Sequence, residues 1–469
     1  MAQKPSIPKG TRDFNPSEIA KRNYIFDIIK KNFQTYGFQP IETPSFENSD
    51  TLLGKYGEEG DRLIFKILNS GDFLRKVDDT IYTDKNSNSI APKITEKALR
   101  YDLTVPFARY VVMHQNELDF PFKRYQIQPV WRADKPQKGR FREFFQCDAD
   151  VVGSNSLLQE VELIQLYDAV FSELKLEGAT IKMNNRKILA GIAEVIGAKD
   201  LLIDFTVALD KLDKIGEDGV KKEMLLKGIT EEAIKKASPL FLPQGSNDKQ
   251  LERLGTLLKY SEEGKKGLEE LRFILETIST LGLQSAKLSI DVTLARGLNY
   301  YTGAIFEVAA PEGVKMGSIG GGGRYDDLTG IFGLKNVSGV GISFGLDRIF
   351  LVLEDLKLFP EAIDQSLQVF ILNFGDAEAS QALKLVTILR KNGIKADLYP
   401  DSATSRKQEN KQFKFAMNKK VPYVIIIGEQ ELEKESFTVR NFVDDTQEEY
   451  GMKNVEEFIE HISNRDRWS

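Results

Sequence analysis

A chain of 469 residues exceeds what one hydrophobic core normally serves, so two or three domains are expected. The balance of 64 Lys+Arg against 70 Asp+Glu gives a formal net charge of −6, which excludes a uniformly basic surface and leaves nucleic-acid contacts to local patches. The single cysteine, Cys147, excludes an intrachain disulfide, and with only two histidines it excludes a Cys/His zinc site.

The first predicted element is a helix that begins after Asn15. Asn15 offers an N-cap, Pro16 stands at the first helical position, and Glu18 adds an acidic first turn. Apolar residues then recur at helical spacing as far as Tyr36, and Gly37 is predicted to end the helix.

The following segments are extended, irregular and then helical. Two prolines push residues 38–44 out of the helical region. Residues 69–96 are polar and lack a period, and 84–89 is predicted to be a mobile loop. A strand-rich block is expected at about 98–152, and a helix over 157–174.

The second half begins with a change in composition. Residues 200–282, rich in Lys, Glu and Leu, predict a helical insertion. Strand signals resume at 287–292, and a helix is expected to begin near Leu346. The last hundred residues predict a small α/β domain with a mostly parallel or mixed sheet. Its clearest strands are expected at 369–372 and 424–427, and its clearest helix at 377–392.

An arginine-rich hairpin is the first candidate binding site. Arg140, Arg142 and Phe144 alternate in sequence, so a regular strand would place them on one face. Two guanidinium groups beside a ring suit a nucleotide, with the arginines on phosphate and the ring on the base. A solvated hairpin with surface ion pairs explains the same residues equally well.

Gln146 and Asp150 continue this alternation and would point into the same cavity. An amide and a carboxylate there suit a cationic or polar small molecule, or else they satisfy nearby backbone groups. Gly320–Gly323 match neither the spaced glycines of a dinucleotide fold nor a Walker loop, and predict close backbone approach or a bent strand. Cys147 lacks an evident base and is expected to be a small buried side chain.

Taken together, these segments resemble the histidyl-tRNA synthetase family of class II aminoacyl-tRNA synthetases. The three motifs of the class resemble the first helix with the Pro44 segment, the hairpin 132–150, and residues 341–348. Two histidine-specific motifs resemble 296–301 (Arg-Gly-Leu-Asn-Tyr-Tyr) and 322–326 (Gly-Gly-Arg-Tyr-Asp). The motifs occur in the family's order, and the resemblance covers nearly the whole chain.

The resemblance implies an α+β catalytic domain built on a mostly antiparallel sheet, with a helical insertion and a C-terminal α/β anticodon-binding-like domain. The expected boundaries are 1–199 and 283–360 for the catalytic core, 200–282 for the insertion, and 365–469 for the C-terminal domain.

The resemblance also implies roles around ATP. Arg132 and Arg296 are the expected catalytic residues, which approach the α-phosphate from opposite sides. Arg140 and Arg348 would clamp the outer phosphates, and Phe144 would stack on adenine. ATP is a substrate, and Mg²⁺ is expected on its phosphates with no protein ligand assigned.

The histidine substrate is implied to lie beside the same arginines. Asp102, Thr104 and Gln146 would hold its α-amino group, and Asp150 and Tyr301 would recognise its imidazole. The complete expected histidine-binding set is Asp102, Thr104, Arg132, Gln146, Asp150, Arg296, Tyr300, Tyr301 and Tyr325.

The implied reaction is ATP-dependent activation of L-histidine to histidyl-adenylate and its transfer to the 3′ end of tRNA(His), which releases AMP and pyrophosphate. The competing hypothesis is a catalytically inactive synthetase-like regulator of histidine biosynthesis, or a tRNA sensor. Such proteins tend to lose catalytic arginines or the C-terminal domain, and this chain has both.

The resemblance implies a homodimer and a tRNA partner. Candidate tRNA contacts in the C-terminal domain are Arg406, Lys407, Lys411 and Lys414. Two interleaved rings, Phe413 and Phe415, suit unpaired bases, or they face the core of an amphipathic helix with its lysines in water, which is the interpretation we favour. We expect a cytoplasmic protein without a membrane span, since no apolar h-region and no run of about 18 apolar residues occurs.

Overall fold

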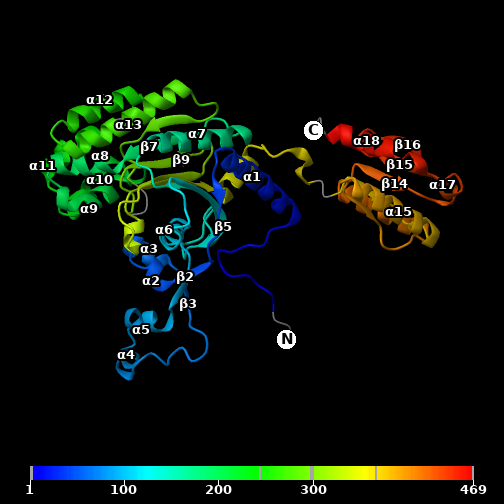
Figure 1. Cartoon of the computed structure of the whole chain (residues 1–469), viewed down its shortest axis with the longest axis horizontal. Helices are drawn as coiled ribbons and strands as arrows, with labels where there is room; N and C mark the ends of the chain where they lie inside the picture. The colour runs from blue at the N-terminus through cyan, green and yellow to red at the C-terminus, as the bar shows by residue number, and fades with distance from the viewer. Residues whose placement is uncertain (1–3, 242–244, 296–299, 365–366, 467–469) are drawn as a thin grey trace. The chain divides into compact units, whose positions relative to one another are not determined.

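The computed structural model of the chain describes residues 4–241, 245–295, 300–364 and 367–466. The chain divides into two compact units, and each is described by itself (Figure 1). The first comprises 1–14 and 22–358, and the second comprises 15–21 and 359–469.

An eight-stranded sheet in the order β1-β5-β6-β11-β10-β9-β7-β8 forms the centre of the first unit. Only the outermost pairs, β1 with β5 and β7 with β8, are parallel. The strands are β1 (Gln39–Pro40), β5 (Phe122–Trp131), β6 (Glu143–Val152), β7 (Thr180–Asn185), β8 (Lys287–Ile290), β9 (Ala304–Ala309), β10 (Gly320–Tyr325) and β11 (Gly339–Gly345). The sheet is therefore mostly antiparallel, as predicted.

Helices α1 (Pro16–Thr35) and α7 (Leu158–Glu173) cover one face of this sheet. The ring of Phe344 on β11 lies 5.8 Å from that of Phe33 on α1 and 4.7 Å from that of Tyr167 on α7. Asn15 and Glu18 cap α1 reciprocally, because each side chain accepts the other's backbone N–H. The predicted start of the first helix is confirmed.

Two predictions for residues 69–152 are wrong. Helix α6 (Thr104–Met113) interrupts the expected strand block, since its buried, β-branched residues pack as a helix despite their strand propensity. Two short helices, α4 (Asp79–Asp84) and α5 (Ser87–Ile94), replace the expected loop, and neither has buried residues. They extend from a small sheet in the order β2-β4-β3 (Figure 1). Its strands are β2 (Phe46–Asn48), β3 (Lys66–Ile67) and β4 (Lys97–Leu99).

Residues 202–241 and 245–281 contain the predicted helices and belong to the first unit. They are α9 (Leu202–Leu209), α10 (Leu212–Leu226), α11 (Glu231–Lys236), α12 (Asn247–Leu257) and α13 (Glu262–Leu281). Glycines let α13 approach α8 (Arg186–Ile196) closely, since a Cβ on Gly191 would lie 2.5 Å from the Cα of Gly264. The three-domain division of the chain stays a prediction.

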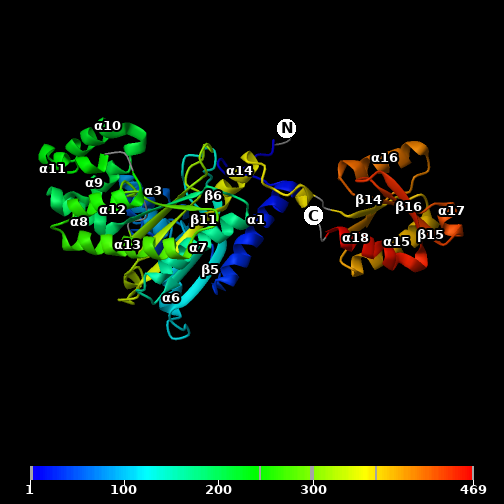
Figure 2. The same ribbon diagram turned by 90° about the horizontal axis from the view of Figure 1, so that it is seen from above.

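The second unit has a mixed five-stranded sheet in the order β13-β12-β14-β15-β16. The strands are β12 (Val369–Ile371), β13 (Ala396–Leu398), β14 (Tyr423–Ile426), β15 (Ser436–Asn441) and β16 (Thr446–Gly451). Figure 2 shows α16 (Arg406–Asn418) on one side of it, and α15 (Asp376–Lys391) and α18 (Val455–Asp466) on the other. Within the described ranges, no helix is long and apolar enough to cross a bilayer.

Candidate active site

A cavity of about 430 Å³ opens on the sheet of the first unit. Strands β6, β10 and β11 all line it, and the lining residues of β6 include the alternating set Phe144, Gln146, Asp148 and Asp150, because side chains of one parity share a face of a sheet. Every residue that the family resemblance assigns to this site and that the structure describes lines the cavity. These residues are Asp102, Thr104, Arg132, Arg140, Phe144, Gln146, Asp150, Tyr300, Tyr301, Tyr325 and Arg348. Arg296 lies outside the described residues.

Three arginines supply positive charge to the cavity. The Arg132 Nε donates to the Tyr101 carbonyl at 3.0 Å, and its guanidinium lies 5.2 Å from the Phe144 ring centre. The Arg348 guanidinium donates to two backbone carbonyls, those of Gly139 and Ser318. Arg348 is therefore held without a carboxylate partner in the described part of the chain, and burial together with the charge of nearby Arg140 lowers its pKa.

The predicted regular strand through Arg140 and Arg142 is wrong. Strand β6 begins only at Glu143, after a turn at Gly139, whose φ of +72° favours glycine. The Arg140 guanidinium pairs with Asp134 at 2.7 Å and lines the cavity. Arg142 instead donates to the Asp134 carbonyl at 3.1 Å and does not line the cavity.

Two buried carboxylates are held by tyrosines. Asp102 accepts from the Tyr56 hydroxyl at 2.8 Å and from the Tyr300 hydroxyl at 3.1 Å, and burial raises its pKa. Asp150 accepts from the Tyr325 hydroxyl at 2.6 Å. Its other oxygen lies 2.7 Å from the guanidinium of the fully buried Arg124. The arginines and these carboxylates give the cavity groups of opposite charge.

A third carboxylate, Asp148, was missed in the sequence. It lies between Gln146 and Asp150 in the same alternation, which was the available signal. Burial raises the pKa of Asp148 to about 7, a rise that Arg124 opposes and the charge of Asp150 increases. Arg124 was also missed, because nothing in the sequence pairs it with Asp150.

The raised pKa makes the stability contribution of Asp148 dependent on pH. Ionising this carboxylate in the folded chain costs free energy that is absent below its ordinary pKa of 3.8 and complete above about pH 7. Asp148→Asn removes this cost, so the variant should unfold at a higher Tm than the wild type. The difference in Tm between variant and wild type should be about 2–4 °C larger at pH 8 than at pH 5. An equal gain at both pH values would contradict the assignment.

Glycines on β10 and β11 keep the floor of the cavity open, as the predicted close backbone approach implies. A Cβ on Gly322 would lie 2.2 Å from the Gly341 carbonyl oxygen. A Cβ on Gly341 would lie 1.9 Å from the Asp150 carboxylate. Neither position accepts a side chain without movement of its neighbours.

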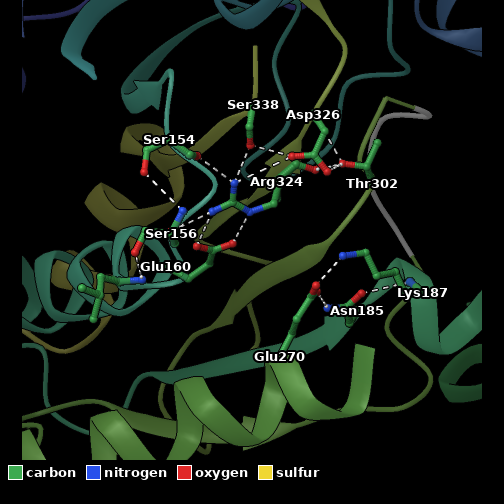
Figure 3. A network of polar contacts seen from close by, with 11 residues as sticks. Ser154, Ser156, Glu160, Asn185, Lys187, Glu270, Thr302, Arg324, Asp326 and Ser338 are labelled. Atoms are coloured by element: carbon green, nitrogen blue, oxygen red, sulfur yellow. Dashed lines mark hydrogen bonds and ion pairs between the residues drawn. The ribbon is translucent and has the colours of Figure 1, made fainter. Parts of the chain in front are cut away.

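A polar network surrounds Arg324 on β10, whose side chain does not line the cavity (Figure 3). The Arg324 guanidinium pairs with both oxygens of Glu160 on α7, at 2.5 and 2.6 Å. It also donates to Ser338 at 2.5 Å, and Ser338 donates to Asp326 at 2.6 Å. Asp326 in turn accepts from Thr302 at 2.7 Å. The network thus joins α7 to the segments that carry the cavity tyrosines 301 and 325.

The predicted basic residues of the second unit lie on α16. Arg406, Lys407, Lys411 and Lys414 are all exposed. The Phe415 ring lies 5.3 Å from that of Phe370, and Phe413 packs against the core cluster of that face. Phe413 is therefore half-buried, whereas Phe415 contacts the core cluster yet stays 39% exposed, and a tRNA role for the four cations stays a prediction.

Known proteins match both units. The histidyl-tRNA synthetase family model matches residues 93–349, and the anticodon binding domain matches 368–465. A histidine--tRNA ligase of Christiangramia forsetii is 67% identical over 441 residues, 94% of this chain and 96% of the relative. That of Flavobacterium johnsoniae is 64% identical over 461 residues, again 94% and 96%. A crystal structure of histidyl-tRNA synthetase from Nostoc sp. aligns with a TM-score of 0.81 at 30% identity, covering 99% of this chain and 100% of that one.

The mostly antiparallel sheet, the arginine-lined cavity and the C-terminal domain define a class II aminoacyl-tRNA synthetase fold, as predicted. Within that class, the chain belongs to the histidyl-tRNA synthetase family. The resemblance in the sequence is therefore confirmed.

Proposed function

We propose that the protein activates L-histidine with ATP to form histidyl-adenylate and transfers the histidyl group to the 3′ end of tRNA(His). The main support is one cavity that holds both the predicted arginines and the predicted amino-acid contacts. The names of its close relatives agree with this activity. The regulator hypothesis gains no support, since Arg132, Arg140 and Arg348 all line the cavity.

The first step is an in-line attack of the histidine carboxylate on the α-phosphorus of ATP, and pyrophosphate leaves. Negative charge spreads over the phosphoryl oxygens, so fixed cations should supply most of the acceleration. Arg132 serves the α-phosphate and the histidine carboxylate, while Arg140 and Arg348 hold the outer phosphates. Phe144 stacks on adenine. Backbone carbonyls already orient Arg132 and Arg348, which reduces the reorganisation needed during the reaction.

The amino acid lies at the carboxylate-lined part of the cavity. Asp102, Thr104 and Gln146 hold the α-amino group, and Asp150 and Tyr301 border the imidazole. A pocket that hydrogen-bonds a polar side chain rejects apolar analogues by about 10⁴- to 10⁵-fold, because its buried polar groups would otherwise stay unpaired. This selectivity requires no editing site.

Further partners belong to the same proposal. Mg²⁺ arrives with the ATP phosphates as part of that substrate, and no protein ligand is assigned. In the second step, a terminal ribose hydroxyl of tRNA attacks the mixed anhydride and releases AMP. Arg406, Lys407, Lys411 and Lys414 on α16 contact the tRNA backbone. The protein works as a cytoplasmic homodimer.

Exchange of radiolabelled pyrophosphate into ATP tests the activation step. Histidine alone among the amino acids should support exchange, because only its ring meets the polar pocket. Exchange with a different amino acid would still support the ATP site, but it would refute the assignment of the histidine pocket. Absence of exchange from folded, ATP-supplied protein would favour the regulator.

A further inference from the structure

The N-terminal segment, residues 8–14, contacts the hairpin that carries Arg140. The backbone N–H of Arg142 donates to the Gly10 carbonyl at 2.8 Å. Gly10 has a φ of +89°, and a Cβ on it would lie 2.8 Å from the Arg142 side chain and 2.9 Å from that of Pro136. Glycine permits both this backbone conformation and this close approach. The N-terminal segment is therefore fixed on the hairpin through its backbone.

Arg12 extends from this segment to helix α14 (Leu346–Asp355). Its guanidinium forms an ion pair with Asp347 in the first turn of that helix. The buried Arg22 of α1 donates to the same oxygen, Asp347 Oδ1, at 2.6 Å. The Arg12 guanidinium also lies 3.7 Å from the centre of the Phe141 ring on the hairpin, where a cation–π contact is attractive. Arg12 thus joins the hairpin to the start of α14.

Arg348 directly follows Asp347 in α14, and it is one of the two arginines assigned to the outer phosphates. Its guanidinium donates to the Gly139 carbonyl of the hairpin at 3.0 Å. The N-terminal segment is therefore connected to Arg348 in two ways, through Asp347 and through the hairpin. Arg12 itself does not line the cavity, so it can act on ATP only through residues that do.

Asp347 is a cavity residue whose charge opposes the binding of phosphates. It lines the cavity and is 5% exposed. A carboxylate near a polyphosphate repels it, most strongly where burial limits screening by water. The guanidinium groups of Arg12 and Arg22 offset this charge and fix the side chain. Without Arg12, Asp347 would compete with the phosphates for the arginines of the cavity.

We propose that Arg12 is a positioning residue for the outer phosphates of ATP, which holds Asp347 in place and so keeps Arg348 available to the β- and γ-phosphates. This inference rests on the proposed function, in which Arg348 binds those phosphates. The effect of Arg12 should be selective, because contacts with adenosine and the α-phosphate do not depend on Asp347.

Calorimetric titration of the wild type and Arg12→Ala with ATP and with AMP, both with Mg²⁺, tests this proposal. We expect the Kd for ATP to rise about tenfold in Arg12→Ala, the lower end of the range for a lost hydrogen bond to a charged group. The Kd for AMP should stay within about twofold, because AMP lacks the outer phosphates. Arg12→Lys keeps the charge beside Asp347 and should recover part of the ATP affinity. An unchanged Kd for ATP, or an equal rise for both nucleotides, would overturn the proposal.

Asp347→Asn tests the route from Arg12 to the phosphates. Once the charge at 347 is removed, a further Arg12→Ala change should alter the Kd for ATP by less than about threefold, because the effects of residues in direct contact are not additive. A rise of about tenfold in this background as well would show that Arg12 does not act through Asp347, and it would overturn the proposal.

Lys123→Ala is the matched control, because Lys123 makes the same kinds of contact elsewhere in the first unit. Its ammonium pairs with Glu162 at 2.7 Å and lies 4.5 Å from the centre of the Phe38 ring. Its side chain is 23% exposed, against 25% for Arg12, and it does not line the cavity. Lys123→Ala should lower the Tm and leave the Kd for both nucleotides unchanged.

The titrations contain no histidine, so their result is independent of the exchange assay. Wild-type protein that binds ATP without supporting pyrophosphate exchange would refute the proposed function, and the comparison of ATP with AMP would still decide the role of Arg12. Histidine-dependent exchange by the wild type, together with an unchanged Kd for ATP in folded Arg12→Ala, would overturn this inference alone.

Discussion

Arg132→Ala is expected to slow adenylate formation by about 10²- to 10³-fold or more, with the fold retained. The guanidinium lies against the ring of Tyr101, at 4.3 Å from its centre, and donates to the carbonyl of the same residue. Its remaining N–H groups are thus fixed before ATP arrives. Pyrophosphate exchange measures the loss, and circular dichroism checks the fold.

Arg142→Ala is the control for that experiment. Arg142 belongs to the same hairpin, but its guanidinium donates to backbone carbonyls of Lys9 and Asp134 outside the cavity lining. Its exchange rate should stay within about threefold of wild type, because the half-buried Arg142 side chain does not line the cavity. Equal losses in the two variants would mean that Arg132 acts through the hairpin rather than on the phosphate.

Glu160→Ala is expected to give the largest loss of stability, about 3–5 kcal/mol of unfolding free energy. Glu160 is fully buried and Arg324 is 4% exposed, so truncation removes the closest carboxylate of a buried guanidinium and leaves only Asp326, at 3.7 Å, as an ion-pair partner among the described residues. Ser338 and the carbonyls of Ser154 and Ser156 remain as neutral acceptors (Figure 3). Urea unfolding of the whole chain measures the change.

An exposed ion pair provides the comparison for Glu160→Ala. Glu262 pairs with Lys265 at 2.7 Å, and its side chain is 89% exposed. Glu262→Ala should cost less than about 1 kcal/mol, because water solvates both groups once they separate. Similar losses of unfolding free energy in the two variants would show that burial does not increase the contribution of the Arg324–Glu160 ion pair to stability.

The sequence predicts elements whose signals are local. The capping pair Asn15 and Glu18 encodes the start of α1 within four residues. Helix α6 is missed because its apolar, β-branched residues have strand propensity, and only packing against distant segments favours the helix. Local propensity therefore predicts capped, amphipathic elements better than fully buried ones.

The site follows the same rule. The family motifs identify eleven residues that line one cavity. Arg124 and Tyr56 escape notice because their partners, Asp150 and Asp102, are distant in sequence. Asp148 could have been found in the sequence, because it lies between Gln146 and Asp150 in the same alternation.

The glycines beneath the cavity have a consequence for how this family tolerates mutation. At Gly341 an added methyl group meets the Asp150 side chain, so a smaller residue at 150 could act as a second-site suppressor at the expense of its carboxylate. At Gly322 the methyl group meets backbone, which no substitution can shrink. Genetic reversion at 322 should therefore restore glycine itself, although the residue has no side chain with which to take part in the reaction.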